Sequence, residues 1–350
     1  MTNELRSNCI DLICLTEPSF VSEYEDTCRF LKEFLTMERS GDIVLVSVES
    51  EENEGFFVKE EDMLYGVPFG KNIDHKNPAE TFRSENLKKY SVSEFTTIFL
   101  RIERSFDYNL ETLKYRFPKI HIVEDPLWAN YYHNKRHLLD LQKELGYPDW
   151  MPQMDLVENF ETFNTLQEKY QEFVLKPTKG SGGRAVLSFE KDSGGARIMR
   201  NGDQTLPFED GIQMINQILF NRDVYLIQEL LDISQSDSRC AVINGEIVTS
   251  FKRTPKGKHY LANVGKGGTI SMAEPDADEL QIVETLIPMF ADKGIHMFGI
   301  DTMVDFNGKR KLTEINVSNT AGFSYAERLT GEPVVANAAR LIWQNILSKN

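Results

Sequence analysis

The sequence predicts a mixed α/β fold: a parallel α/β unit at the N-terminus, a small β-rich unit in the middle and an antiparallel sheet at the C-terminus. Three observations support this prediction. In residues 1–125, apolar runs alternate with a helix-like segment, which is typical of parallel strands joined by helices. Short apolar runs flank a glycine cluster in the middle of the chain, and two Asn-Gly pairs separate apolar runs in the last third, as in antiparallel hairpins. At 350 residues the chain suits two or three domains.

The N-terminal unit begins with two predicted strands, at residues 10–15 (IDLICL) and 43–48 (IVLVSV). The segment between them, "SEYEDTCRFLKEFLTM", predicts a helix, so strand, helix and strand follow in the order of a parallel α/β unit. Two further apolar runs, 95–100 and 120–123, extend the pattern. Residues 50–90 are charged and mixed in composition, and no structure is predicted for them.

The rest of the chain predicts two helices among strands and turns. Residues 134–145 have apolar side chains at helical spacing and end at Gly146-Tyr147-Pro148, a stop signal. A small β-rich element with loose turns follows. Asn244-Gly245 and Asn307-Gly308 then mark two hairpins, and residues 276–293 between them predict the second helix.

The composition excludes several classes of protein. With 41% hydrophobic residues the chain can bury a substantial core, and its net charge of -15 disfavours nucleic acid and anionic membranes as partners, because an acidic surface repels phosphate. Any phosphate ligand therefore needs a local basic pocket. The cysteines and histidines show no zinc-ligand spacing, and no nucleophile motif such as G-x-S-x-G is present. Without a signal-peptide pattern or an apolar run of the ~18–20 residues that span a membrane, we expect a soluble cytoplasmic protein with reduced thiols.

The stretch "VLKPTKGSGGRAV" (residues 174–186) is a candidate phosphate-binding loop. Consecutive glycines let the backbone approach a ligand and present several N–H groups to phosphate oxygens, and Lys176 and Lys179 add positive charge. The spacing is that of neither a P-loop nor a dinucleotide-binding turn. A flexible surface turn would have the same composition, so both interpretations stay open. The residues of the cluster are Gly180, Ser181, Gly182 and Gly183.

A second candidate site combines Asp301 in "FGIDTMVDF" with Glu314 and Asn316 in "LTEINV". Asp301 lies on one arm of a predicted hairpin, and the other two residues, two apart on the opposite arm, project to one face. Two carboxylates and an amide oxygen are suitable ligands for magnesium, which also keeps positions for water and substrate phosphates. The alternative is the solvated acidic face of a sheet, although the neighbouring residues are apolar.

Basic residues flank the first hairpin. Arg239 enters its first strand and Arg253 leaves its second, so the two side chains can lie close together. Two guanidinium groups would suit a carboxylate substrate or a transferring phosphoryl group, whereas an exposed charged strand end is the alternative. The loop that follows, residues 258–268, is rich in glycine and basic residues, and it is either a lid over a substrate or a surface loop.

Taken together, the order of these motifs resembles the ATP-grasp superfamily, and most closely the bacterial glutathione synthetases. The order is the lysine helix "HNKRH", V-L-K-P with the glycine cluster, Q-E-L-L, D-x-R, R-x-P, a glycine lid, G-I-D and E-I-N. The resemblance implies three domains, residues 1–128, 129–227 and 228–350, with ATP between two sheets. It implies phosphate contacts for Lys135 and Lys176, carboxylate orientation and catalysis for Arg239 and Arg253, metal ligation for Asp301, Glu314 and Asn316, and contacts to the nucleoside for Gln228, Glu229, Leu230, Leu231 and Asp237.

Enzymes of this family transfer the γ-phosphoryl group of ATP to a substrate carboxylate, and an amine then attacks the acyl phosphate to form an amide. The resemblance therefore implies a ligase that uses ATP with Mg2+, or alternatively Mn2+, acts on a small-molecule acid and amine, and assembles as a homo-oligomer. Such chemistry depends on positioning and charge neutralisation rather than on a protein nucleophile.

The sequence departs from the glutathione synthetases on the acceptor side. Residues 101–107 (RIERSFD) lack both prolines of the family's R-x-D-P-P-x-D pattern, and Leu261 stands where an arginine is usual. Three hypotheses about function follow: a ligase for γ-glutamylcysteine and glycine, a ligase for another acid or a protein tail, and a synapsin-like ATP-binding regulatory protein. The residues to which the resemblance assigns substrate contacts are Arg101, Asn263, Gly267, Gly268 and Ser318.

Overall fold

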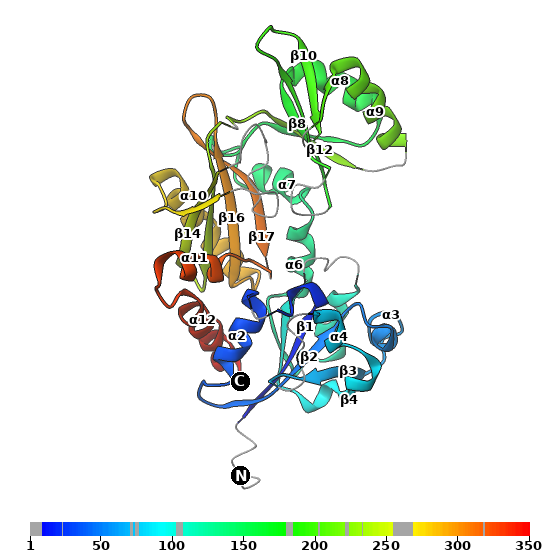
Figure 1. Cartoon of the computed structure of the whole chain (residues 1–350), viewed down its shortest axis with the longest axis vertical. Helices are drawn as coiled ribbons and strands as arrows, with labels where there is room; N and C mark the ends of the chain where they lie inside the picture. Colours follow the sequence, from blue (N-terminus) through cyan, green and yellow to red (C-terminus); the bar gives the residue numbers. More distant parts are fainter. Residues whose placement is uncertain are drawn as a thin grey trace.

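A computed structural model of the chain describes residues 9–22, 24–70, 73, 77–102, 108–179, 185–201, 204–220, 224–232, 234–254, 269–317 and 319–350. These residues form three sheets arranged along the long axis of the molecule. The N-terminal unit lies at one end, the central unit at the other, and the third sheet between them (Figure 1). The predicted combination of α/β and antiparallel units is confirmed.

The first sheet has the strand order β4-β3-β2-β1-β5-β6. Strands β2, β1, β5 and β6 are parallel, as predicted, whereas β3 and β4 pair antiparallel at one edge. These two edge strands come mainly from the charged segment for which no structure was predicted. The bounds are β1 Ile10–Thr16, β2 Ser40–Ser47, β3 Met63–Pro68, β4 Lys88–Ser91, β5 Thr97–Arg101 and β6 His121–Val123, with helices α2 Asp26–Phe34, α3 Glu54–Val58, α4 Pro78–Thr81 and α5 Leu113–Arg116.

The central unit is an antiparallel sheet of order β11-β10-β9-β8-β12-β7 with two helices. Its own core contains Phe163, Phe173, Phe189 and Ile215, so the unit is held together by contacts between its helices and strands. The rings of Phe173 and Phe189 stack at 4.6 Å between centroids. The bounds are β7 Met154–Val157, β8 Phe173–Pro177, β9 Leu187–Lys191, β10 Arg197–Asn201, β11 Gln204–Pro207, β12 Tyr225–Glu229, α8 Phe160–Tyr170 and α9 Phe208–Phe220.

The third sheet is antiparallel, with the order β15-β14-β13-β16-β17. Both predicted hairpins are confirmed. Asn244 and Gly245 have φ values of 49° and 82°, the two positive values that a type I′ turn requires, and Asn307-Gly308 lies in the loop between β16 and β17. The bounds are β13 Asp237–Ile243, β14 Glu246–Thr254, β15 Thr269–Met272, β16 Met297–Val304 and β17 Arg310–Val317.

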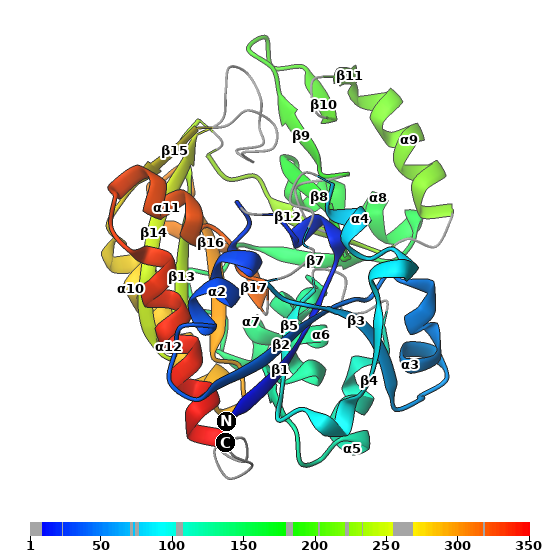
Figure 2. The same ribbon diagram turned by 60° about the horizontal axis from the view of Figure 1, so that its bottom comes forward.

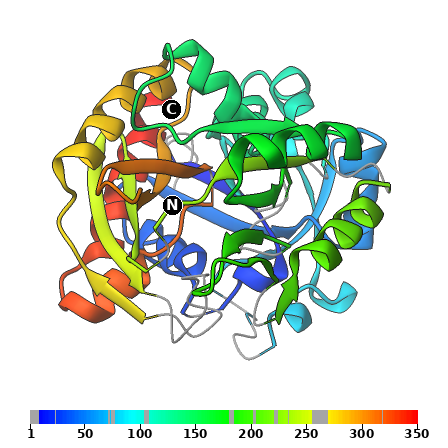
Figure 3. The same cartoon turned by 90° about the horizontal axis from the view of Figure 1, so that it is seen from above.

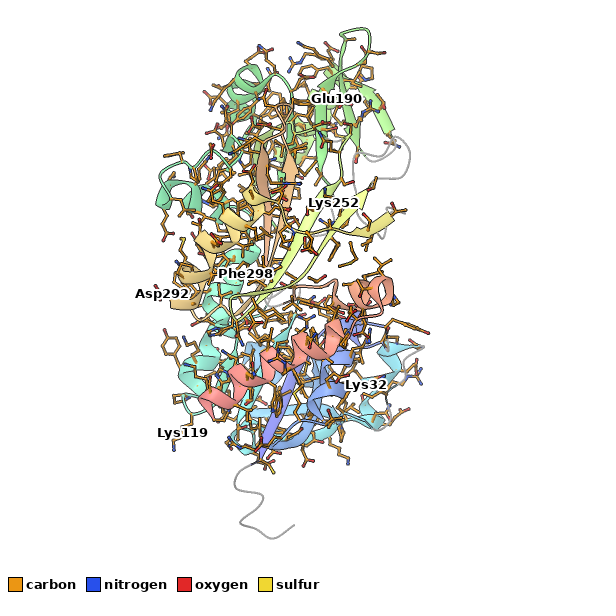
Figure 4. All side chains as sticks on the ribbon, turned by 90° about the vertical axis from the view of Figure 1, so that its left-hand side faces the viewer. Lys32, Lys119, Glu190, Lys252, Asp292 and Phe298 are labelled. Carbon is orange, nitrogen blue, oxygen red and sulfur yellow. The ribbon has the colours of Figure 1, made fainter. Side chains whose placement is uncertain are left out.

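One face of the third sheet is apolar and packs on helices. Val242, Phe298, Ile300 and Ile315 form a core with α10 (Ala277–Asp292), α6 (Pro126–His133) and α7 (His137–Glu144). Figure 4 labels Phe298 and, at the end of α10, Asp292, which mark this helix-covered side. Helices α6 and α7 thus pack on the third sheet although they precede the central unit in sequence, and the domain limits 1–128, 129–227 and 228–350 stay a prediction.

The other face of the third sheet contributes apolar side chains to a second core at one end. Ala241, Ile243 and Met297 share a core with the first sheet and with α2, α11 (Phe323–Thr330) and α12 (Val334–Lys349). Figure 2 shows these three helices side by side. The N-terminal unit and the third sheet are therefore joined by continuous apolar packing, and the remaining part of this face is available for polar side chains.

Two further predictions concern the cysteines and membranes. Cys9, Cys14, Cys28 and Cys240 are all free thiols, and all but Cys9 are buried. Among the described residues, none of the helices combines the length and the apolar character that crossing a bilayer requires.

Candidate active site

The polar part of the third sheet carries a row of charged side chains across three strands. Arg239 on β13 pairs with Asp301 on β16, and Asp301 pairs with Glu314 on β17. Directly paired residues project to the same face of a sheet, so these three side chains lie in one row. Asn316, two residues beyond Glu314, projects to that face as well and pairs with Gly299.

Asp301 is held between two arginines. Its carboxylate accepts hydrogen bonds from Nε and Nη2 of Arg239, both at 2.6 Å, and Nη2 of Arg253 lies 3.0 Å away. Arg253 also donates to both carboxylate oxygens of Asp237 at 2.8 Å. Burial by itself raises the pKa of Asp301, but the charges and hydrogen bonds of Arg239 and Arg253 outweigh it and hold that pKa well below its usual range. The site therefore contains a buried, fully ionised carboxylate between two fixed guanidinium groups.

Two lysines bring further positive charge to the row. Lys135, between α6 and α7, lies 3.2 Å from Oε1 of Glu314, and its backbone N–H donates to the carbonyl of Thr178 at 2.8 Å. Lys176, on β8 of the central unit, donates to Oε1 of Gln228 at 3.0 Å. Burial lowers the pKa of Lys176 to about 8, and the charge of Glu314 opposes this effect. The charged row on the third sheet and Lys176 on β8 therefore form one site. This site lies between the third sheet and the central unit, which Figure 3 shows from above.

Three side chains on this face were predicted to be ligands of a divalent cation, although both carboxylate oxygens of Asp301 already accept hydrogen bonds from Arg239. Asp301, Glu314 and Asn316 offer two carboxylates and an amide oxygen, the hard ligands that magnesium takes. Nδ2 of Asn316 is buried without a hydrogen-bond partner in the part of the chain that the structure describes, so this donor is not satisfied by the described protein groups. Within the same residues no three His, Cys, Asp or Glu side chains form a metal-binding group, so a cation here would need Asn316, water or substrate oxygens as further ligands.

The segment assigned to the nucleoside is the end of β12 and the residues after it. Gln228, Leu230 and Leu231 are buried. The side chain of Glu229 accepts a hydrogen bond from the backbone N–H of Gln153 at 2.9 Å. The segment lies between β12 of the central unit and β13 of the third sheet. Its contacts with adenine and ribose stay a prediction.

The remaining candidate residues either have partners other than the predicted ligands or lie outside the described residues. Asp237, which the resemblance assigned to the ribose, pairs with Arg253 in the charged cluster of the third sheet. Arg101 lies at the end of β5, only 1% exposed. Eight candidates fall outside the described residues: Gly180, Ser181, Gly182, Gly183, Asn263, Gly267, Gly268 and Ser318.

Two features of the site did not emerge from the sequence. The first is Asp237 as the partner of Arg253, for which the D-x-R spacing was an available signal. The second is the side chain of Gln228 as the partner of Lys176. An amide in the apolar strand "YLIQE" needs a buried hydrogen-bond partner, and that requirement could have indicated the contact.

Comparison with solved structures identifies the fold. The VanG D-Ala:D-Ser ligase from Enterococcus faecalis superposes with a TM-score of 0.62 at 12% identity and covers 97% of this chain and 99% of its own. The D-cycloserine synthetase DcsG gives 0.61 at 14% identity, with 95% and 99% covered. The fold is that of the ATP-grasp ligases.

Comparison of sequences narrows the class to a family. Residues 142–331, more than half of the chain, match the family described as "Prokaryotic glutathione synthetase, ATP-grasp domain", and the chain belongs to that family. The glutathione synthetase of Brucella melitensis biotype 1 is 26% identical over 278 residues, 78% of each chain. That of Thermosynechococcus vestitus is 26% identical over 196 residues, 56% of each chain. The resemblance seen in the motifs is confirmed.

Proposed function

We propose that this protein is an ATP-dependent ligase that joins a carboxylate to an amine through an acyl phosphate. The observation that carries the proposal is the row of Arg239, Asp301 and Glu314, with Arg253 and Lys135 in contact with it. A regulatory nucleotide site needs groups that bind phosphates. In addition, this site has the guanidinium groups of Arg239 and Arg253, each held in place by a carboxylate. Two such groups suit a second ligand that bears a carboxylate, which a regulatory nucleotide site would not need.

In the first step, a carboxylate oxygen of the acid attacks the γ-phosphorus of ATP, and ADP leaves. Lys135 and Lys176 would lie against the phosphates, where their ammonium groups offset the charge on the transferring group. A magnesium or manganese ion held by Asp301, Glu314 and Asn316 would supply further charge neutralisation. The glycine cluster begins just after the strand that carries Lys176, so we propose that its N–H groups cover the same phosphates.

In the second step, the amine attacks the carbonyl carbon of the acyl phosphate, and inorganic phosphate leaves. Arg239 and Arg253 would orient the acid and stabilise the oxyanion of the tetrahedral intermediate. Both guanidinium groups are fixed before any substrate binds, because Asp301 and Asp237 hold them with paired hydrogen bonds. Little reorganisation is then required when the charge develops.

The names of the relatives suggest γ-glutamylcysteine and glycine as the first substrates to test. The identity of about one quarter and the absence of both prolines in residues 101–107 favour including other acids and amines as well. Two arginines in the site support a carboxylate-bearing acid in either case.

The test is ADP formation by the purified protein with magnesium and ATP, screened over γ-glutamylcysteine, other small acids and amine acceptors. The ligase proposal predicts that one acid and amine pair stimulates ADP formation and yields an amide. If ATP binds but no pair stimulates ADP formation, the synapsin-like regulatory alternative replaces it.

Binding of ATP is expected to take up protons above about pH 8 because of Lys176. With its pKa lowered to about 8 by burial, this lysine is partly neutral there, and phosphates favour the charged form. Between pH ~8 and 10.5 the folded protein also binds fewer protons at Lys176 than the unfolded chain, so this group's contribution to stability rises with pH in that window.

Calorimetric titration with ATP in buffers of different ionisation enthalpy measures this uptake. Uptake should disappear in Lys176→Arg, because a guanidinium stays charged, and persist in the control Lys169→Arg, an exposed lysine of the same unit. Unchanged uptake in Lys176→Arg would show that another group titrates.

A further inference from the structure

The turn after β17, residues 319–322, crosses the same face of the third sheet as the charged row. Thr320 is buried there, and its hydroxyl donates to the carbonyl of Asn316 at 2.9 Å. Its Cγ2 lies 3.0 Å from where a Cβ on Gly299 would stand, so the glycine makes room for it. Because Gly299 pairs with Asn316, Thr320 covers the sheet directly beside the proposed metal ligand.

Gly322 brings the turn equally close to the arginines. A Cβ at this position would lie 2.5 Å from the ring of Phe251, and the φ of 123° is a value that other residues rarely adopt. Phe251 is the strand partner of Arg239 and projects to the same face. The 319–322 turn is therefore a wall of the site, next to both Asn316 and Arg239.

The N-terminal unit holds this turn at two points. Nη1 and Nη2 of Arg101, on β5, donate to the carbonyl of Thr320 at 3.4 and 3.3 Å. Asp26, in the first turn of α2, accepts hydrogen bonds from the N–H of Gly322 at 2.9 Å and of Ser324 at 2.7 Å, and from the hydroxyl of Ser324. Two charged side chains from one unit thus fix the backbone of a loop that belongs to the other.

Arg101 is poorly placed to contact a substrate. It is 1% exposed, its Nε donates to Oγ1 of Thr27 at 3.1 Å, and its guanidinium lies 5.4 Å from the ring centroid of Phe30 and 5.9 Å from that of Phe99. A substrate carboxylate would have to displace these packed groups to reach it. Its burial therefore favours an indirect role over the predicted direct contact with the acid.

We propose that Arg101 and Asp26 are positioning residues, which hold the 319–322 turn as a wall of the acid-binding part of the site without touching the acid. The substrate part of this inference rests on the proposed ligase function. The fixing of the turn by the N-terminal unit does not, and it can be measured without turnover.

The first test is the Michaelis constant of the acid in Asp26→Asn and Arg101→Lys. Asparagine is neutral and has one acceptor oxygen where aspartate has two, so the N–H groups of Gly322 and Ser324 both lose a charged partner and at least one of them loses its acceptor. We expect the KM for the acid to rise about tenfold and the KM for ATP to change less than about twofold, because hydrogen bonds to charged groups are among the stronger ones. Combining the two changes should add little, since both act on one turn.

Arg29→Met is the matched control. Arg29 comes from the same helix as Asp26 and pairs with Glu327 on α11, and among the described residues no hydrogen bond or ion pair links its side chain to the turn. Its KM values should stay unchanged. If Arg101→Lys raises the KM for the acid and Asp26→Asn does not, Arg101 contacts the acid and the proposal is overturned. A lower Tm with both KM values unchanged overturns it as well, because the two residues are then merely structural.

The second test is hydrogen–deuterium exchange over residues 319–324 in the protein without substrates. Exchange at the N–H groups of Gly322 and Ser324 should be faster in Asp26→Asn than in the wild type or in Arg29→Met, while β16 stays protected. This result is expected even if no acid and amine pair turns over, so it separates failure of this inference from failure of the ligase proposal. Unchanged exchange in Asp26→Asn would refute the role assigned to Asp26.

Discussion

Glu314→Gln is expected to lower kcat by at least about 100-fold, the size of effect seen when one stabilising group for developing charge is removed. The glutamine loses the negative charge that a metal ligand and a partner for Lys135 require. It keeps an oxygen that can still accept a hydrogen bond from Lys135, and the Glu314 side chain is 29% exposed, so the free energy of unfolding should change by only about 1 kcal/mol or less.

Steady-state ADP formation and urea unfolding measure the two effects. Glu246→Gln is the control, because Glu246 is an exposed carboxylate at the far end of the same sheet. Full activity of Glu314→Gln would exclude Glu314 from the metal and phosphate site.

Asp301→Asn is expected to have the largest effect on stability. It leaves Arg239 without its bidentate partner and Arg253 with only Asp237, and Asp301 is 4% exposed. Removing one partner of a buried ion pair costs about 3–5 kcal/mol, because a charge stays buried without compensation. Activity should be lost as well.

Urea unfolding near neutral pH measures this loss of stability. Adding Arg239→Met to Asp301→Asn should restore part of the lost free energy of unfolding. The folded pKa of Asp301 is lowered, so its stabilising contribution is complete above the ordinary value of 3.8 and is lost as the pH falls towards the folded pKa. The difference between wild type and variant should shrink over that acidic range. A difference near zero at neutral pH would mean that the ion pairs add nothing to stability.

The sequence predicted the strands that carry the site, but it could not predict on which face each side chain lies. In the β16–β17 hairpin, Thr302 pairs with Leu312 and Val304 with Arg310. If this register continued without interruption, Asp301 would lie opposite Thr313. A β-bulge between Asp301 and Thr302 shifts the register by one residue and places Glu314 opposite Asp301 instead. Because a shift of one residue reverses the face, the bulge is what brings the two carboxylates together.

The β13–β14 hairpin has the same feature. The pairing of Ile243 with Glu246 at the turn would place Lys252 opposite Asp237. A bulge between Ala241 and Val242 places Arg253 there, on the face of Arg239. Spacing along the chain shows that two arginines flank the turn, but a bulge depends on packing with neighbouring strands, which a single strand's sequence does not reveal.

The indirect role proposed for Arg101 could not be predicted from the sequence for a related reason. The motif around it suggested substrate binding, yet its partners Thr27 and Thr320 are far from it in sequence and belong to two different units. Charge and motif identify a residue that matters, whereas burial by a distant unit decides whether it touches a ligand. Strands β3 and β4 were missed because β3 is a short run, MLYGVP, inside a charged segment, and β4, KKYS, shows no apolar alternation.

The central claim is that a carboxylate is activated as an acyl phosphate and then joined to an amine. The most direct measurement uses an acid that supports ADP formation, with its carboxylate labelled by heavy oxygen, and follows the label by mass spectrometry. We predict one labelled oxygen in the inorganic phosphate, ADP as the nucleotide product, and an amide that retains the other label. Label in AMP, or unlabelled phosphate accompanying the amide, would contradict the account.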